Sequence, residues 1–369
     1  MNNVIMNGCD LHDKNMALKS AVGTEKPQTK WFGNTTEGRQ RTIDYARELA
    51  KKHGAERIVF AYEASGQGYG LYDELTAAGI ECYVLAPTKM EKSAQQRKQK
   101  TDEKDALRIL EALRGHFLAG NDLPAMAWIP DHQTREDREV VRCRLDAQEK
   151  VTLVKTQVQS LLKRNRVSKP AEVGKSSWTV RHRRWLAEVV GEKESLPAGA
   201  RVALESLLRQ LAFLEGEVAR LDGKLENLSK EPRYAWPVKA MRKRQKGVGT
   251  LTAMVYLTEM GDLSRFRNRR QVAAYLGVVP SSNDSGERER KGHITRQGSP
   301  RVRKVLCQAV WSAIRSAPQL RAAYQRIAAK NPKKKKIAVV AMMRRLGIRL
   351  WHIGLEAQLQ AEVFKKTAA

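Results

Sequence analysis

Along the first 125 residues, short apolar runs alternate with longer segments whose apolar positions recur every three or four residues. The runs predict strands at residues 4–10, 16–22 and 29–33, and a helix follows at residues 36–53. Beyond it the pattern predicts a buried strand at residues 57–63, a helix at 69–78, a strand at 82–86 and a helix at 102–118. Three strands at hairpin spacing followed by β-α-β-α units indicate a layered α/β domain over residues 1–125.

Two carboxylates stand at the ends of predicted strands. Asp10 ends the first strand and Glu63 ends the fourth. In a ribonuclease H-like sheet these two strands are parallel neighbours, so both side chains would meet at the same edge of the sheet. A flavodoxin-like sheet is the alternative for this order of elements, and the positions of the acids favour the ribonuclease H-like fold.

A second pair of acids, Asp102 and Asp105, opens the helix predicted at residues 102–118. Their spacing of three places both on one face of that helix, about one turn apart. Carboxylates held together repel one another, and divalent cations relieve that repulsion. Mg²⁺ takes carboxylate and phosphate oxygens, and two ions about 4 Å apart can serve both oxygens of a phosphodiester exchange. We therefore predict a catalytic magnesium site whose ligands are these two acids together with Asp10 and Glu63.

The middle of the chain, residues 126–235, carries an apolar repeat with alternating steps of three and four. Its members are Leu204, Leu207, Leu211, Leu214, Val218, Leu221, Leu225 and Leu228, and a shorter series, Ala147, Val151, Val154, Val158 and Leu161, precedes it. Such a repeat predicts long helices that pack through this stripe, as an antiparallel helical hairpin or as an intermolecular coiled coil. Between the two series, residues 167–200 mix Pro, Gly and basic residues and predict a loop or a basic insertion that contacts nucleic acid.

The net charge of +28 is concentrated in the last third of the chain. Between positions 232 and 369 there are 30 Lys and Arg residues against 7 Asp and Glu residues. A field of this sign attracts polyanions, of which nucleic acid is the commonest. A basic surface that serves solubility or a ribosomal-type contact is the alternative. Residues 236–369 are predicted to be mainly helical, so the whole chain is α/β followed by α.

A Gly-x-Gly turn enters a predicted helix in this basic region. Gly247 and Gly249 follow Lys243, Arg244 and Lys246, and they precede an apolar helix at residues 251–260. Backbone N–H groups at the start of a helix bind anions, so the turn resembles the hairpin of helix-hairpin-helix modules, which hold DNA phosphates without reading sequence. We expect the glycines and the three basic side chains to contact nucleic acid.

The four cysteines are widely spaced and form no C-x-x-C pair, which argues against a zinc site and a disulfide framework. No stretch has the character of a signal peptide or the length of a membrane span. These observations predict a protein of a reducing cytoplasm with no membrane partner.

Several motifs resemble those of the transposases of the insertion-sequence one-ten family, including its one-eleven-eleven branch. The acid motifs of that family are similar to Gly8-Cys9-Asp10, to Glu63-Ala64-Ser65-Gly66 and to Lys100-Thr101-Asp102-Glu103-Lys104-Asp105-Ala106. Its later motifs are similar, in order, to Gly247-Val248-Gly249, Ala273-Ala274-Tyr275-Leu276-Gly277, Pro280, Ser285-Gly286 and Met342-Met343-Arg344-Arg345. The resemblance covers nearly the whole chain.

Members of that family are bacterial DNA recombinases with an N-terminal RuvC-like DEDD domain, a coiled-coil middle and a C-terminal transposase domain. The resemblance implies that the four acids are catalytic and that Ser285 is the nucleophile, which forms a phosphoserine link to DNA. Arg288, Arg290 and Lys291 follow it and are expected to neutralise the bound phosphate. The resemblance further implies donor and target DNA as substrates and a structured bridge RNA as guide. The apolar repeat at Leu204–Leu228 is long enough to join subunits, and recombination exchanges several strands in one complex, so we expect at least a homodimer that becomes a tetramer on DNA. We expect the protein at the bacterial nucleoid.

Some residues depart from the family pattern. Cys9 replaces an aliphatic residue beside the first acid. Negative charge surrounds the proposed nucleophile, from Asp284, Glu287 and Glu289. Competing hydroxyls come from Ser281, Ser282 and Ser299. Two other functions stay open: a magnesium-dependent nuclease for Holliday-junction-type structures that uses water, and a nucleic-acid-binding scaffold without catalysis.

Overall fold

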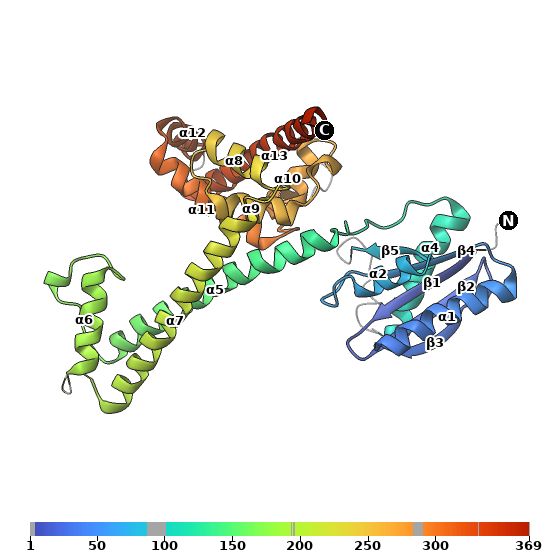
Figure 1. Ribbon diagram of the computed structural model, residues 1–369, viewed down its shortest axis with the longest axis horizontal. Helices are drawn as coiled ribbons and strands as arrows, with labels where there is room; N and C mark the ends of the chain where they lie inside the picture. Colours follow the sequence, from blue (N-terminus) through green and yellow to red (C-terminus); the bar gives the residue numbers. More distant parts are fainter. Residues whose placement is uncertain are drawn as a thin grey trace. The chain divides into compact units, whose positions relative to one another are not determined.

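The structure, a computed structural model, describes residues 4–86, 101–192, 194, 196–282, 291–330 and 332–368. The chain divides into two compact units, Met1–Pro130 and Asp131–Ala369. In the described residues the first unit is α/β and the second is almost entirely helical (Figure 1). A further boundary at residue 235, within the second unit, stays a prediction.

Unit 1 contains a five-stranded mixed sheet with the strand order β3-β2-β1-β4-β5. Its strands are β1 (Val4–Leu11), β2 (Asn15–Val22), β3 (Gln28–Gly33), β4 (Arg57–Glu63) and β5 (Glu81–Leu85). β1 pairs antiparallel with β2 and parallel with β4, so the carboxyl ends of β1 and β4 lie side by side. The mixed sheet is confirmed, and each strand lies within about one residue of its predicted position.

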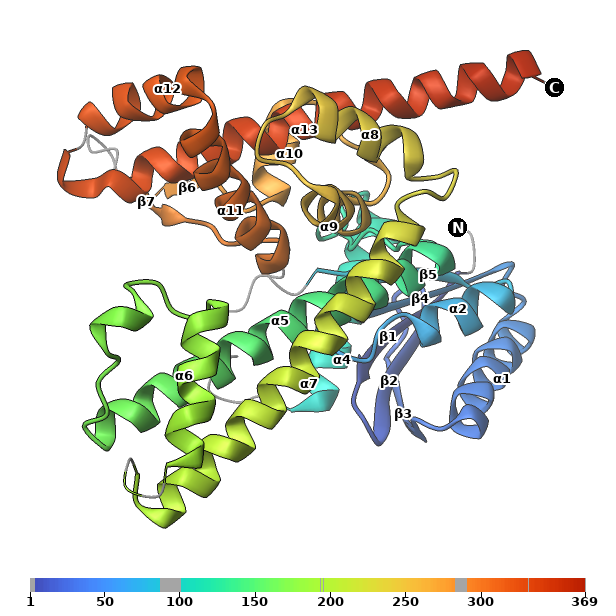
Figure 2. The same ribbon diagram turned by 60° about the vertical axis from the view of Figure 1, so that its left-hand side comes forward.

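Among the described residues, the helices that flank this sheet are α1 (Thr36–His53), α2 (Gly70–Ala77) and α4 (Asp102–Ala119). Successive side chains of a strand point to opposite faces, and β1 follows this rule. Met6 packs in one core with Leu110 of α4, whereas Cys9 packs in another with Ile43 of α1 and Leu71 of α2. The sheet is therefore covered by α4 on one face and by α1 and α2 on the other (Figure 2).

Unit 2 begins with an arm of two long helices. These are α5 (His132–Arg164) and α7 (Ala198–Leu228). Ion pairs between them run in opposite chain order, Arg144 with Asp222 at 2.6 Å and Lys155 with Glu215 at 2.8 Å, so the helices are antiparallel. The two helices lie side by side along the arm (Figure 1). Apolar side chains of their repeats, among them Val151, Val154 and Leu211, pack in one core. An intermolecular coiled coil formed by this arm stays a prediction.

Residues 167–200, at the tip of the arm, are more ordered than a loop. They contain the 3-10 turn η2 (Ala171–Val173) and helix α6 (Val180–Gly191). Trp185, Leu186 and Val189 lie on one face of α6 and pack in a core with apolar side chains of α5 and α7. The expectation of a loop was wrong for α6, because this apolar face is buried against the arm.

The rest of unit 2 packs around one large apolar core. Its helices are α8 (Ala235–Arg244), α9 (Thr250–Met260), η3 (Leu263–Arg265), α10 (Arg269–Tyr275), α11 (Pro300–Ser316), α12 (Pro318–Ala329), η4 (Pro332–Lys334) and α13 (Lys335–Ala368). Helix α9 is central, since residues 253–260 are all buried. The hydroxyl of Tyr256 donates to the carbonyl of Gly347 in α13 at 2.6 Å. Within the described residues, no helix has both the length and the apolarity needed to cross a bilayer.

A short hairpin interrupts these helices. Strand β6 (Pro280–Ser282) pairs antiparallel with β7 (Lys291–Ile294). The motif residue Pro280 and the two serines that follow it therefore form a strand. Residues 283–290 lie outside the described residues.

Candidate functional site

The alternation of side chains along β1 and β4 decides where two of the predicted acids point. Val4 and Met6 of β1, and Val59 and Ala61 of β4, belong to the core that faces α4. Since side chains alternate along a strand, Asp10 lies on the same face as Met6, and Glu63 lies on the same face as Ala61. Both acids therefore stand at the carboxyl ends of neighbouring parallel strands, on the face that α4 covers.

Helix α4 brings the other two acids to this edge. Asp102 and Asp105 lie in its first turn. The side-chain oxygen of Thr101 caps that turn, because it accepts a hydrogen bond from the backbone N–H of Lys104 at 3.4 Å. Carboxylates are stabilised at a helix N-terminus by the partial positive charge of its free N–H groups. The cap and the dipole thus favour the placement of acids at this end of α4.

Gly8 allows α4 to lie directly on β1. A Cβ atom at this position would be 2.4 Å from the carbonyl oxygen of Ala106 and 2.4 Å from the nitrogen of Leu110. Both atoms belong to the backbone of α4, so neither can rotate away. A residue without a side chain is therefore required where the strand and the helix backbone meet.

Replacing Gly8 with alanine should push α4 away from the sheet and lower the free energy of unfolding by about 1–3 kcal/mol. The start of α4 would move with it, so metal-dependent activity should fall further than the loss of folded protein explains. Urea unfolding of the full chain measures the first effect. Gly70→Ala is the matched control, because a Cβ there meets nothing within 4 Å. Equal stability of the Gly8 and Gly70 variants would contradict the close-packing argument.

The four acids form two pairs, and a cationic or protonatable side chain joins each pair. Nε2 of His12 lies 3.1 Å from Oδ2 of Asp10 and 3.3 Å from Oδ1 of Asp102. The guanidinium of Arg108 contacts Glu63 and lies 3.3 Å from Oδ1 of Asp105. The side chain of Asp105 is 15% exposed and that of Asp102 is 39% exposed, so the site is open on the side of Asp102.

Electrostatics at Asp10 indicate an excess of negative charge. Burial raises the pKa of this carboxyl above its ordinary value, His12 lowers it in part, and the negative charges of Asp105 and Asp102 raise it further. A group in this position ionises more readily when a cation is bound beside it. The charge balance of the site is thus suited to a divalent cation.

Ligand atoms of Asp10, His12 and Asp102 all lie within 4.8 Å of one another, so one ion can reach all three. The structure therefore brings together two of the four predicted ligands, and it adds a histidine. Glu63 and Asp105 lie at the same end of the sheet but are joined through Arg108. An acidic site for a divalent metal is supported, and the choice of Mg²⁺ stays a prediction.

Sequence reasoning missed His12 and Arg108. His12 follows Asp10 by two positions, so the alternation of a strand places both on one face. Arg108 follows Asp105 by three positions, which places both on one face of α4. Both signals were present in the sequence, but only the tertiary structure shows which acids these side chains contact.

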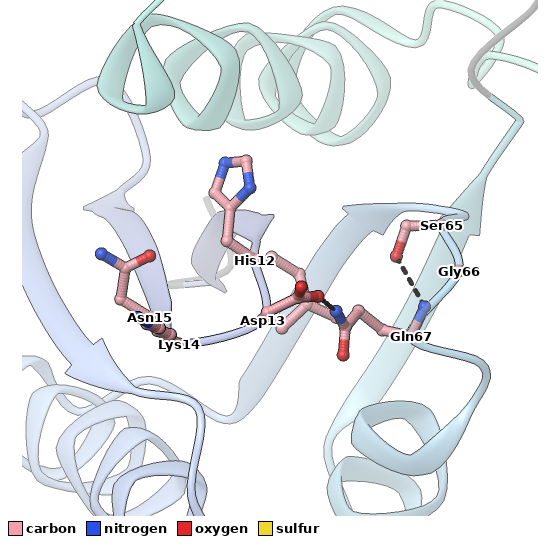
Figure 3. Close-up of a pocket in the computed structure, with 8 residues that line it drawn as sticks. His12, Asp13, Lys14, Asn15, Ser65, Gly66 and Gln67 are labelled. Carbon is pink, nitrogen blue, oxygen red and sulfur yellow. Dashed lines mark hydrogen bonds between the residues drawn. The ribbon is translucent and has the colours of Figure 1, made fainter.

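A hollow of about 680 Å³ lies beside His12. It is formed by residues 11–15, between β1 and β2, and by residues 65–67, which follow β4. Figure 3 shows the ring of His12 directed towards helix α4, whereas Asp13 points the other way and accepts a hydrogen bond from the Gln67 amide. Exposed Lys14 also lines this hollow, which is large enough for part of a nucleotide chain.

The predicted anion-binding turn lies between α8 and α9. Lys243 and Lys246 are exposed, and Arg244 pairs with Glu356 at 2.6 Å. Gly247 has a φ of +84°, and a Cβ there would lie 2.4 Å from the carbonyl oxygen of Ala309 in α11. Gly247 therefore has a packing role. Gly249 is the N-cap of α9 and provides no side-chain cap, so the first N–H groups of that helix need other partners.

The predicted nucleophile, Ser285, and the neighbouring Arg288 and Arg290 lie outside the described residues. Lys291 begins β7, and its side chain is not described. The hairpin that carries this segment is held at its base by Arg303 of α11. The guanidinium of Arg303 donates to the carbonyls of Leu276, Gln297 and Gly298 at 3.3, 2.9 and 3.0 Å.

Comparisons with known proteins give consistent matches. Residues 8–166 match a family model for DEDD transposases of the IS110 type, described as "Transposase", and residues 243–325 match one described as "Transposase IS116/IS110/IS902 family". The chain is 29% identical over 332 residues to the putative transposase y4qE of Sinorhizobium fredii, and the aligned region covers 82% of this chain and 77% of that protein. It is 24% identical over 253 residues to the transposase for insertion sequence element IS1533 of Leptospira borgpetersenii, with coverages of 68% and 69%.

One solved structure similar to part of this chain is T. thermophilus RuvC in complex with a Holliday junction substrate. The alignment has 14% sequence identity and a TM-score of 0.25, and it covers 33% of this chain and 99% of that chain.

Proposed function

The chain belongs to the IS116/IS110/IS902 family of transposases, and on that premise we propose that it cuts and rejoins donor and target DNA with divalent metal ions held by unit 1. The observation that carries the proposal is the convergence of Asp10, His12 and Asp102 at the end of β1. Glu63 and Asp105 stand at the same end of the sheet, within reach of Arg108. We propose all four acids as the catalytic metal ligands.

Bound divalent ions, with Mg²⁺ as the predicted species, would supply charge stabilisation for the oxygens that exchange at phosphorus. The protein residues have separate tasks. Asp10 and Asp102 would hold an ion, Arg108 would keep Glu63 and Asp105 in place, and the hollow beside His12 would take the DNA strand. Lys14, exposed in that hollow, would contact a phosphate.

We propose Ser285 as the nucleophile, on the basis of the family motif. Its Oγ would form a bond to phosphorus while one O–P bond of the DNA backbone breaks, and the released deoxyribose oxygen would take a proton. Rejoining reverses these steps, and the phosphoserine link conserves the energy of the phosphodiester bond. The acids and Ser285 belong to different compact units, so the metal ligands and the nucleophile come from separate parts of the chain.

We further propose that unit 2 supplies most of the nucleic-acid contacts. Exposed Lys243 and Lys246 precede α9 closely in the chain, and its Gly249 N-cap supplies no side chain to the first N–H groups, a combination that suits a phosphate. Arg288, Arg290 and Lys291 would neutralise a phosphate near Ser285. Contacts with phosphates position the backbone of the nucleic acid but do not read its base sequence.

Sequence recognition would then come from a structured bridge RNA that pairs with donor and target DNA. The large positive charge supports this assignment, since a protein that binds an RNA and two DNA duplexes contacts many phosphates. We propose a homodimer that becomes a tetramer on DNA, working at the bacterial nucleoid. Exposed Leu153 of α5 and Phe213 of α7 offer apolar surface on the arm for such an assembly.

Purified, RNA-free protein should exchange donor and target strands only when RNA transcribed from beside its own gene is added with Mg²⁺. Binding of that RNA should weaken by about a thousandfold between 50 and 200 mM salt, as phosphate contacts do. An unrelated structured RNA of equal length is the control. Sequence-specific exchange without RNA would refute the guide, whereas an absence of exchange with every RNA and metal would refute the proposed function.

A further inference from the structure

His12 occupies a position that the four-acid scheme leaves without a role. Its Nε2 lies between the carboxylate oxygens of Asp10 and Asp102, on the open side of the site. We propose that His12 is itself a metal ligand through Nε2, and that this nitrogen makes the site prefer Mn²⁺ to Mg²⁺. The inference rests on the proposed function, because it concerns which ion the Asp10 side of the site takes.

The distances around His12 fit coordination. Two ligands in adjacent positions of an octahedral ion, each about 2.1–2.2 Å from the metal, are separated by about 3.0–3.1 Å. Nε2 of His12 lies 3.1 Å from the oxygen of Asp10 and 3.3 Å from that of Asp102. Since all three ligand atoms lie within 4.8 Å of one another, a small inward shift lets one ion bind all three.

The orientation of the side chain also fits. His12 continues the face of β1 that carries Asp10, and Figure 3 shows its ring directed towards α4, where Asp102 begins the helix. The side chains of His12 and Asp102 are each 39% exposed. The remaining coordination positions are therefore accessible to water or to a phosphate oxygen from the neighbouring hollow.

The preference for Mn²⁺ over Mg²⁺ follows from the ligand atoms, which are one imidazole nitrogen and two carboxylate oxygens. Mg²⁺ favours oxygen ligands and retains its water, and it gains little from an imidazole. First-row transition metals accept imidazole nitrogen, and Mn²⁺ is the member of that series closest to Mg²⁺ in its preference for carboxylates. Because Glu63 and Asp105 already share Arg108, His12 supplies the third protein ligand on the Asp10 side.

A competing role for His12 is that of a counter-ion, which would balance the carboxylates in the metal-free protein and leave when any ion binds. The two roles predict opposite results. Loss of a ligand weakens Mn²⁺ binding and spares Mg²⁺, whereas loss of a counter-ion strengthens the binding of both ions.

The experiment uses the full chain and Mn²⁺ alone as the probe. Pulsed electron paramagnetic resonance of bound Mn²⁺ should show coupling to a histidine nitrogen, and the signal should change when histidine is labelled with ¹⁵N. His12→Ala should abolish the coupling and weaken Mn²⁺ binding by about tenfold or more, while Mg²⁺ binding changes by less than about twofold. His53→Ala is the matched control, since His53 ends α1 and its ring lies 3.9 Å from the carboxylate of Glu25.

The outcomes separate the inference from the function on which it rests. Asp10-dependent Mn²⁺ binding without nitrogen coupling, or coupling that survives in His12→Ala, would overturn the ligand role and leave an oxygen-only metal site. Tighter binding of both ions to His12→Ala would establish the counter-ion instead. Mn²⁺ affinity that is unchanged in Asp10→Asn would remove the metal site itself, and the proposed function with it.

Discussion

Replacing Asp10 with asparagine should reduce DNA strand cleavage by about a thousandfold or more, which corresponds to about 4 kcal/mol of lost transition-state stabilisation. The amide preserves the size of the side chain but removes the charge that would hold an ion next to Asp102. Nucleic-acid binding should stay within about twofold of normal, because the proposed phosphate contacts from the basic residues of unit 2 would dominate it. Cleavage of labelled DNA and binding by filter retention measure the two quantities separately.

Asp10→Asn should also change the stability of the metal-free protein. The pKa of the Asp10 carboxyl is raised in the folded protein, so the fold favours the protonated form of this group. The stability that it contributes is present at a pH below its pKa in the unfolded chain, and it is lost as the pH rises through its pKa in the folded protein. Metal-free Asp10→Asn should therefore be at least as stable as the unmodified protein at neutral pH. Asp44→Asn, at an exposed position of α1, is the matched control. Near-normal recombination by Asp10→Asn would show that the site is assigned incorrectly.

Replacing Ser285 with alanine should abolish both the covalent protein–DNA adduct and strand exchange. A nicked or suicide DNA substrate traps the adduct in the unmodified protein, because the released end cannot be rejoined. The peptide attached to DNA should contain Ser285 when it is identified by mass spectrometry. A hydroxyl attacks phosphorus only when it is activated, so Asp10→Asn should also lose the adduct.

Neighbouring serines provide controls for this experiment. The hydroxyl of Ser281 already donates to the carbonyl of His293 across the β6–β7 hairpin at 3.0 Å, so Ser281→Ala should retain the adduct. Ser282→Ala should retain it as well. An adduct that persists in Ser285→Ala would move the nucleophile to another hydroxyl. Efficient cutting with no adduct at all would favour the nuclease that uses water.

The elements of unit 1 were predictable because local patterns mark them clearly. The helix at Thr36–His53 begins after Thr35, which caps it, and ends before Gly54, whose φ of 59° stops it. The strands are short apolar runs, and β4, the strand predicted to be buried, is buried from Val59 to Tyr62. In unit 2, α6 was missed as a helix because its apolar face is short and lies among basic residues.

For the candidate site, the sequence supplied residue types and spacing but not contacts. Asp10 and Glu63 could be placed at one edge because parallel strands end together, and their roles as metal ligands stay predictions. The contacts of His12 with Asp102, and of Arg108 with Glu63, join residues 90 and 45 positions apart in the chain. No local pattern encodes such contacts, because they depend on how closely α4 approaches the sheet.

The sequence by itself determined the alternation of strands and helices, the strong positive charge of the last third, and the family motifs around the four acids. Tertiary structure alone decided that α4 lies in backbone contact with β1 at Gly8, that His12 stands between Asp10 and Asp102, and that Arg108 joins the other two acids. The physical reason is the separation in sequence between the residues that interact. Periodicity and capping act between residues a few positions apart, whereas the charge balance of a metal site is set by side chains that only packing brings together.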